Sequence, residues 1–203
     1  MTQRPLMRFM LGVLIYFPVT FFIWYLSAAW HLAPITMLSQ ALLNTLTPDA
    51  LMWLKLDGHH LIVAANFSQA ANGSIVTPAL NGDALGFQIN PLVYSYGLPL
   101  LVSLLLATPT NHKFTKIVMG LALILPTELF SMIFSILKTL TFNIGSTFIA
   151  QQSLSQTEVD VIALGYQIGM LLLPMIAPLV IWVGLNRQFM TQLAPQLEYA
   201  FKG

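Results

Sequence analysis

Four apolar runs long enough to cross a bilayer constrain this chain more than any other feature of its sequence. They cover residues 9–27, 92–108, 117–137 and 161–185. The hydrocarbon core of a membrane is about 30 Å thick, and a helix needs about 20 apolar residues to cross it. Only 7% of the residues are charged, whereas ordinary soluble domains carry about 25%. The sequence therefore predicts an α-helical integral membrane protein with four transmembrane helices.

Basic residues gather on one side of the predicted membrane. Six of the eight lysines and arginines precede the first run, separate the second run from the third or follow the fourth: Arg4, Arg8, Lys113, Lys116, Arg187 and Lys202. Cytoplasmic loops carry an excess of Lys and Arg, so both termini and residues 111–116 are predicted to be cytoplasmic. Residues 31–90 and 139–160 are then external.

This topology divides the chain into three predicted parts. Residues 1–30 hold a cytoplasmic N-terminus and the first transmembrane helix. Residues 31–90 form an external segment, which is too short for the core of an ordinary independent domain. Residues 91–203 form a bundle of the other three transmembrane helices, followed by a short cytoplasmic tail.

The first apolar run could instead be a cleaved signal peptide. Arg4 and Arg8 make a basic start, and the small residues at 27–29 resemble a cleavage site. The run is longer than a usual signal core, however, and Trp24 and Tyr25 crowd the cleavage position. An uncleaved membrane anchor is the favoured interpretation.

The external segment is predicted to begin with an amphipathic helix that lies at the membrane interface. Residues 34–46 and their flank place polar side chains on one helical stripe and apolar side chains on another. The polar stripe is Thr36, Gln40, Asn44 and Thr47, and the apolar stripe is Ile35, Leu38, Leu42 and Leu46. A helix with separate polar and apolar stripes suits the boundary between water and lipid.

Antiparallel hairpins are predicted after this helix. Asp57-Gly58 lies between two apolar stretches and favours a two-residue turn, which would pair Leu54 with Leu61. A second hairpin is expected around residues 81–83, because residues 85–89 alternate between apolar and small or polar side chains. The external segment is therefore expected to be a small α+β layer.

Glu128 is an acidic residue deep inside the third apolar run. An ionised carboxylate near the bilayer centre costs at least about 2.5 kcal/mol, so this group is expected to be neutral or partnered. Ser131 and Ser135 fall on the same helical stripe at 100° per residue. The stripe could serve as a proton relay or docking site, or Glu128 could simply hydrogen-bond a neighbouring helix.

The fourth run contains a second candidate for helix docking. Gly165 and Gly169 form a small-xxx-small pair that permits close approach of another helix, and Tyr166 and Gln167 offer hydrogen bonds. Packing within the chain and docking of a partner explain this pair equally well.

No catalytic, cofactor or metal site is predicted. The chain has no cysteine, which excludes thiol nucleophiles and cysteine-ligated metals. His59 and His60 are adjacent on the predicted hairpin, where neighbouring side chains point to opposite faces and cannot easily share one ion. Basic residues are too sparse for a nucleic-acid surface.

Three stretches carry a resemblance to a known family: residues 90–100 (NPLVYSYGLPL), 163–174 (ALGYQIGMLLLP) and 185–189 (LNRQF). Together they resemble the exosortase H-associated membrane proteins, which are small inner-membrane proteins of Gram-negative bacteria found alongside an exosortase. The resemblance implies a multi-pass protein of the bacterial inner membrane, with residues 31–90 in the periplasm. Exosortases are membrane transpeptidases that use a Cys, an Arg and a His, so this cysteine-free chain resembles the companion and not the enzyme.

The leading hypothesis is a non-enzymatic accessory subunit that assists an exosortase. It would stabilise the enzyme or present the C-terminal sorting tail of its substrates, so the expected partners are the lipid bilayer and either the exosortase or the substrate tail. A homo-oligomer is also possible. The alternative is a small transporter or proton-coupled subunit that uses Glu128, and an uncharacterised membrane enzyme is the least favoured class.

Overall fold

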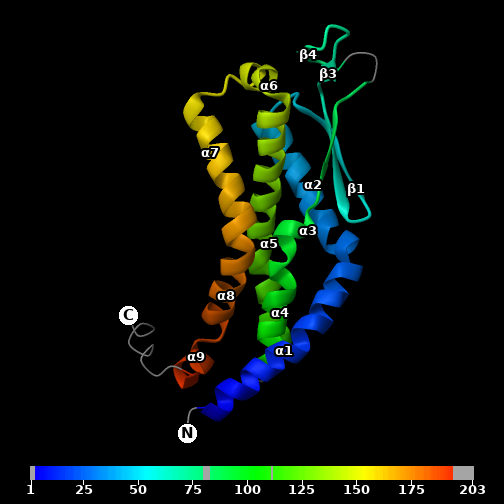
Figure 1. Cartoon of the computed structure of the whole chain (residues 1–203). Helices are drawn as coiled ribbons and strands as arrows, with labels where there is room; N and C mark the ends of the chain where they lie inside the picture. Colours follow the sequence, from blue (N-terminus) through cyan, green and yellow to red (C-terminus); the bar gives the residue numbers. More distant parts are fainter. Residues whose placement is uncertain (1–2, 80–82, 111, 194–203) are drawn as a thin grey trace. The chain divides into compact units, whose positions relative to one another are not determined.

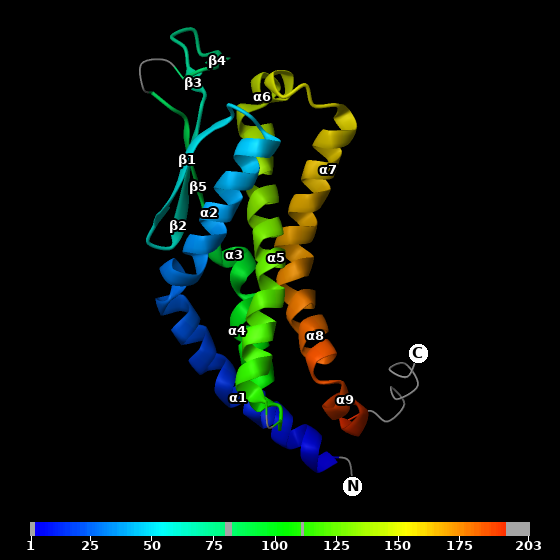
Figure 2. The ribbon, with the colours of Figure 1, turned by 180° about the vertical axis from the view of Figure 1, so that it is seen from behind.

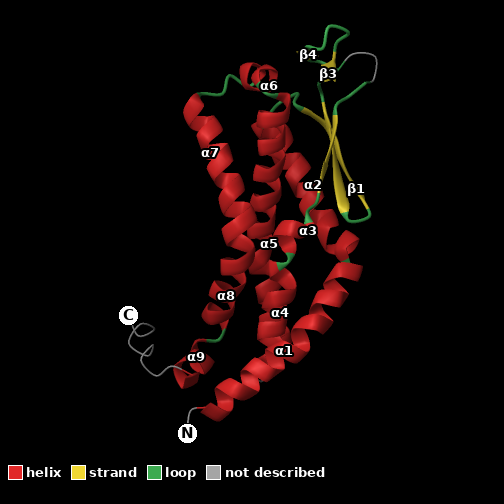
Figure 3. Cartoon of the chain, in the orientation of Figure 1, coloured by secondary structure: helices red, strands yellow, loops and turns green. Residues whose placement is uncertain are grey.

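Helices dominate the computed structural model, which describes residues 3–79, 83–110 and 112–193 (Figures 1 and 3). The longer helices are α1 (Gln3–Leu26), α2 (Ala28–Leu46), α4 (Gly97–Ala107), α5 (Lys113–Thr139), α7 (Gln156–Gln167) and α8 (Leu173–Leu185). The shorter helices are α3 (Leu92–Ser95), α6 (Ser146–Gln151) and α9 (Arg187–Leu193), and two π-helical turns are η1 (Leu140–Ile144) and η2 (Ile168–Leu172). The strands are β1 (Leu51–Asp57), β2 (His60–Ala65), β3 (Ser68–Gln69), β4 (Ile75–Val76) and β5 (Gly86–Ile89).

Three helical stretches are long and apolar enough to cross a membrane: Pro5–Leu26, Lys113–Ile144 and Gln156–Leu185. The second apolar run is also helical, but it forms the shorter stretch Leu92–Ala107, which is divided at Tyr96 into α3 and α4. Sixteen residues rise about 24 Å at 1.5 Å each, less than the hydrocarbon thickness. Three of the four predicted spans are therefore matched by long helices.

The chain falls into two compact units. Unit 1 comprises Met1–Ser27, Tyr96–Thr127 and Pro174–Gly203, and unit 2 comprises Ala28–Ser95 and Glu128–Leu173. Each unit combines segments that are far apart in the sequence. The apolar helices α5 and α7–α8 contribute residues to both units.

In unit 1, α1 packs against α4. A Cβ added to Gly12 would lie 3.1 Å from the Cβ of Ala107, so this contact is close. Farther along α1, the Thr20 hydroxyl donates a hydrogen bond of 3.0 Å to the carbonyl oxygen of Pro99. A buried side-chain bond to a main-chain carbonyl is a common device between membrane helices.

The core of unit 1 contains a cluster of three aromatic side chains. The ring of Phe9 stacks on Trp182 with centroids 5.0 Å apart and meets Phe189 at 5.4 Å. The Trp182 indole N–H donates to the Thr108 hydroxyl at 2.8 Å. This bond satisfies the single polar atom of the indole ring, which would otherwise be buried without a partner.

In unit 2, the first predicted hairpin is confirmed, with a different register. β1 and β2 pair antiparallel, and Leu56 lies opposite Leu61 while Asp57 lies opposite His60. The two turn residues are therefore Gly58 and His59, and not Asp57 and Gly58. Gly58 has a φ of 58°, and a positive φ at the first turn position is the glycine-first arrangement of type II′ hairpins.

The second predicted hairpin is wrong in its pairing. The predicted strand over residues 85–89 exists as β5, but it pairs antiparallel with β2 and completes a three-stranded sheet of order β1-β2-β5. The intervening chain forms the separate two-stranded sheet of β3 and β4. The predicted turn at residues 81–83 falls largely outside the described residues.

The predicted interfacial helix starts earlier than expected. α2 begins at Ala28, and Pro34 lies inside it instead of at its start. The predicted apolar stripe is divided, because Leu38, Leu42 and Leu46 are exposed while Ile35 is buried. The buried face of α2 also includes Leu32 and Leu43. Only one face of α2 therefore joins the core of unit 2. α2 packs beside β1 (Figure 2), and the Gln40 side chain accepts a hydrogen bond from the Leu54 amide.

The predicted external loop over residues 139–160 is partly helical. α5 runs on into η1, and α6 follows after Gly145. Phe148 of α6 is fully buried against Phe67, with ring centroids 6.2 Å apart. Gln152 donates to the Pro48 carbonyl at 2.9 Å, so α6 is held against the segment between α2 and β1.

Candidate functional site

The polar stripe of α5 is buried. Glu128, Ser131 and Ser135 are 4%, 2% and 6% exposed, respectively. They recur at intervals of three and four residues, which keeps them on one face of a helix. The sequence predicted this stripe, and all three of its residues belong to unit 2.

The carboxyl group of Glu128 has an oxygen, Oε1, that is buried and forms no hydrogen bond to any described residue. An ionised carboxylate deep in a membrane segment would be costly in such surroundings. The neutral acid is the form that this environment tolerates better. Glu128 is therefore the least satisfied polar group of the α5 stripe.

Ser131 connects α5 to η2. Its hydroxyl donates a buried hydrogen bond of 2.9 Å to the carbonyl oxygen of Gly169. In η2 the Leu173 amide bonds to the Ile168 carbonyl, five residues back. In the same pattern, the amide of residue 174 would bond to the Gly169 carbonyl. Residue 174 is a proline, however, and has no N–H. Ser131 thus supplies the donor that the proline cannot.

The small-xxx-small pair is used within the chain. A Cβ added to Gly165 would overlap two ring atoms of Phe134, and one added to Gly169 would lie 2.9 Å from the Cα of Ser131. Real contacts of a Cβ are longer than 3.0 Å. Both glycines therefore permit α5 to approach α7 and η2 closely.

Tyr166 and Gln167 have different surroundings. The ammonium group of Lys138 lies 5.4 Å from the centroid of the Tyr166 ring, within the range of a cation–π interaction. Gln167, the last residue of α7, is exposed. The structure thus brings Tyr166 together with the α5 stripe and leaves Gln167 at the surface of unit 2.

A small cavity of about 130 Å³ lies beside this stripe. It is lined by Ile89, Asn90, Val93, Tyr94, Ser135, Tyr166 and Met170. Tyr94 is 4% exposed, and its hydroxyl forms no hydrogen bond of acceptable geometry to the described residues, although it lies near Ser135. The sequence alone does not point to Tyr94 as part of a site, because nothing along the chain links it to Ser135.

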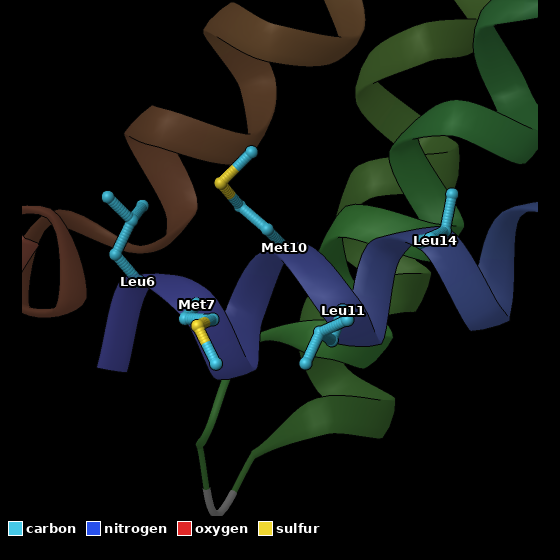
Figure 4. Close-up of a pocket in the computed structure, with 5 residues that line it drawn as sticks. All are labelled: Leu6, Met7, Met10, Leu11 and Leu14. Atoms are coloured by element: carbon cyan, nitrogen blue, oxygen red, sulfur yellow. The ribbon is translucent and has the colours of Figure 1, made fainter. Parts of the chain in front are cut away.

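The N-terminal part of α1 presents a different surface. Leu6, Met7, Met10, Leu11 and Leu14 line a shallow hollow of about 620 Å³ on this helix (Figure 4). All five side chains are apolar and exposed by 45% or more. In a membrane such a surface suits acyl chains, and it offers no group for polar chemistry.

No group of three or more His, Asp or Glu side chains that could hold a metal ion occurs among the described residues. His59 occupies the hairpin turn and His60 begins β2. The described part of the site is thus a buried polar stripe with a small adjoining cavity.

Comparisons with known proteins point to one family. Neither the curated proteins nor the solved structures contain a match to this chain. A family model described as exosortase H-associated membrane protein matches residues 3–189. Since this match covers far more than half of the sequence, the chain belongs to the exosortase H-associated membrane protein family.

Proposed function

We propose that this chain is a non-enzymatic accessory subunit that assists an exosortase in the inner membrane of a bacterium. The observation that carries the proposal is the family match over residues 3–189, which includes the apolar helices and the small antiparallel sheet. The proposed role is to stabilise the enzyme or to present the C-terminal sorting tail of its substrates.

The proposed topology has four spans, with both termini in the cytoplasm. Three spans are the long apolar helices, and the fourth is Leu92–Ala107, a short stretch that a membrane accommodates by local thinning. An even number of spans puts both ends of the chain on the side that holds six of the eight basic residues. In the same proposal, residues 31–90 are periplasmic and residues 91–203 form the bundle with its cytoplasmic tail.

Labelling of introduced cysteines tests this topology directly, because the chain has none of its own. Single cysteines at Ser74 and Thr110 would be treated with an impermeant thiol reagent on spheroplasts. Labelling at position 74 alone is expected. Labelling at position 110 and not at 74 would reverse the proposed orientation.

Co-purification tests the accessory role. The tagged full-length chain would be extracted in a mild detergent from cells that also express an exosortase H, with an unrelated four-span membrane protein as the control bait. Recovery of the exosortase with the tagged chain and not with the control is expected. Recovery at the control level, together with unchanged exosortase abundance when the chain is deleted, would contradict the role.

Glu128 favours a second candidate, a proton-coupled membrane subunit. The supporting observation is that Oε1 of this buried carboxyl has no hydrogen-bond partner among the described residues. Glu128→Gln and Glu128→Leu separate the two functions. The accessory role expects Gln to retain exosortase recovery, whereas a proton-coupled role expects Gln to abolish activity in a folded protein.

A further inference from the structure

β5 is an edge strand of the three-stranded sheet in unit 2. The strand order is β1-β2-β5, so β5 has a paired neighbour on one side only. Its antiparallel pairing with β2 covers four positions: Leu61 with Ile89, Ile62 with Gln88, Val63 with Phe87 and Ala64 with Gly86. Within the described residues, no strand lies against the other side of β5.

The main-chain groups of Gly86 and Gln88 point away from β2. In an antiparallel ladder, hydrogen-bonded pairs alternate with pairs whose N–H and C=O groups point outward. The Ala65 amide donates a hydrogen bond of 2.9 Å to the Leu85 carbonyl, so Leu85 faces β2, and Phe87 follows two residues later. Gly86 and Gln88 are the alternate positions. Their outward N–H and C=O groups have no hydrogen-bond partner in the described part of the chain.

The opposite edge of the sheet is protected, whereas this edge is not. In β1 the Leu54 amide donates to the Gln40 side chain at 3.3 Å, and α2 packs beside this strand. Strand edges are commonly protected by a charged residue, a proline, a bulge or a covering element. Residues 86–89 of β5 are Gly, Phe, Gln and Ile, and their pairing with β2 has a regular register. β5 therefore presents an edge to which another strand can be added.

The chemistry of this edge identifies what fits it. A row of main-chain N–H and C=O groups is complementary to the main chain of another extended polypeptide. Gly86 and Gln88 are exposed, and a Cβ added to Gly86 would have nothing within 4 Å. An aromatic side chain of an added strand can cover a glycine at such an edge. The outer side of β5 is thus open to a strand both chemically and sterically.

The place of β5 in the chain indicates which kind of polypeptide it is. β5 ends at Ile89, three residues before the apolar stretch Leu92–Ala107. Each main-chain hydrogen bond adds little net free energy, so a strand of four residues binds a free peptide weakly. A partner anchored in the same membrane is present at a much higher effective concentration. The occupant that fits best therefore has an extended segment next to a membrane-crossing segment of its own.

We propose that β5 accepts an extended segment of a membrane-anchored partner as a fourth strand of the sheet. The inference rests on the proposed accessory role and names its contact: the occupant is the substrate segment that directly precedes the C-terminal sorting tail. Because β5 and this segment are each followed by a membrane-crossing stretch, the added strand runs parallel to β5. Main-chain bonds to Gly86 and Gln88 require no particular side chain, so one edge serves substrates of different sequence.

Photo-crosslinking in cells tests the proposal. The full-length chain would carry benzoylphenylalanine at Gln88 or, as the matched control, at Lys55, an exposed residue of β1 at the opposite edge. The cells would also express an exosortase H and a tagged substrate with a C-terminal sorting tail. At least fivefold more substrate adduct is expected from position 88 than from position 55. Equal or weaker substrate adduct at position 88 would overturn the proposal, and so would an adduct of position 88 with a second copy of the chain.

Two variants at one position separate main-chain from side-chain contacts. Gln88→Pro removes an outward N–H but no bond to β2, and proline is tolerated at such an edge position. It is expected to lower the recovery of substrate with the tagged chain at least fivefold and to retain the exosortase. Gln88→Ala keeps the N–H and is expected to retain both partners. Equal substrate recovery with the two variants, whether high or low, would overturn the strand addition.

The same samples distinguish failure of this inference from failure of the accessory role. A wild-type chain that recovers neither exosortase nor substrate would contradict the accessory role itself. Recovery of the exosortase without a preferential substrate adduct at Gln88 would contradict the strand addition alone. If Gln88→Pro also loses the exosortase, the crosslinking comparison decides, because it leaves every main-chain N–H in place.

Discussion

Replacing Gly165 by Ala should destabilise this protein, although the same substitution normally stabilises a helix. Ala normally stabilises a helix by about 1 kcal/mol relative to Gly. Here, however, the new Cβ would overlap two ring atoms of Phe134, whereas an ordinary contact is 3.4–4 Å long. The ring must turn, or α7 must move away from α5.

Each way of relieving the clash costs free energy. Turning the Phe134 ring weakens its contact with Phe130, whose centroid is 4.4 Å away, and an aromatic pair is worth about 0.5–1.5 kcal/mol. Moving the helix stretches the bond from Ser131 to Gly169. Overpacking of this kind costs about 1–3 kcal/mol, and losing the bond can add about 1 kcal/mol. We expect a net destabilisation of about 1–3 kcal/mol after the gain in helix propensity.

Gly184→Ala is the matched control, because nothing lies within 4 Å of a Cβ added at this position of α8. It should leave the stability unchanged or raise it by up to about 1 kcal/mol. Both variants would be unfolded with dodecyl sulfate in mixed micelles and followed by circular dichroism. Opposite signs of the two changes are the expected result.

A double-mutant cycle with Phe134→Leu identifies the cause of the Gly165 effect. With the ring removed, Gly165→Ala should cost much less, which gives a coupling energy of at least about 1 kcal/mol. The reasoning would be refuted if Gly165→Ala were as harmless as Gly184→Ala. It would also be refuted if the cost were the same in the Phe134→Leu background.

Three further variants test single contacts. Ser131→Ala leaves the Gly169 carbonyl without its side-chain donor and should cost about 0.6–1.7 kcal/mol in the same unfolding assay; an unchanged stability would show that Pro174 leaves no unmet acceptor. Gly58→Val forces a β-branched residue to a φ of 58° and should cost about 1–3 kcal/mol, detected as faster proteolysis of the hairpin with membrane insertion retained. Trp182→Phe keeps the ring next to Phe9 but removes the bond to Thr108, so a loss of about 0.5–1.5 kcal/mol is expected.

The presence of the first hairpin could be predicted from the sequence, whereas the exact position of its turn could not. Gly58 favours a hairpin turn because it accepts a positive φ, and the hairpin is present. Asp57-Gly58 and Gly58-His59 are both acceptable two-residue turns, and the choice between them shifts the pairing of every residue in β1. Burial of Leu61 and Val63 of β2 in the core of unit 2 depends on the whole layer and not on the turn.

In the candidate site, too, some features could be predicted from the sequence and others could not. The positions of Glu128, Ser131 and Ser135 on one face follow from helical periodicity alone. Their partners do not, because the bond from Ser131 to Gly169 depends on a π-helical turn and on a proline five residues after the acceptor. Tyr94 was missed for a related reason, since its place beside Ser135 requires that α3 be packed against η2.

These contacts also bear on how a partner could recognise this protein. Between membrane helices, apolar surface gives little preference for one neighbour over lipid, so specific association depends on small residues and polar groups. Gly165, Gly169 and Ser131 are engaged within unit 2, which leaves them few means of contacting another chain. Under the proposed accessory role, specificity therefore depends on polar groups that remain accessible, such as the exposed Gln167. The α5 stripe then acts mainly as the support that holds this surface in place.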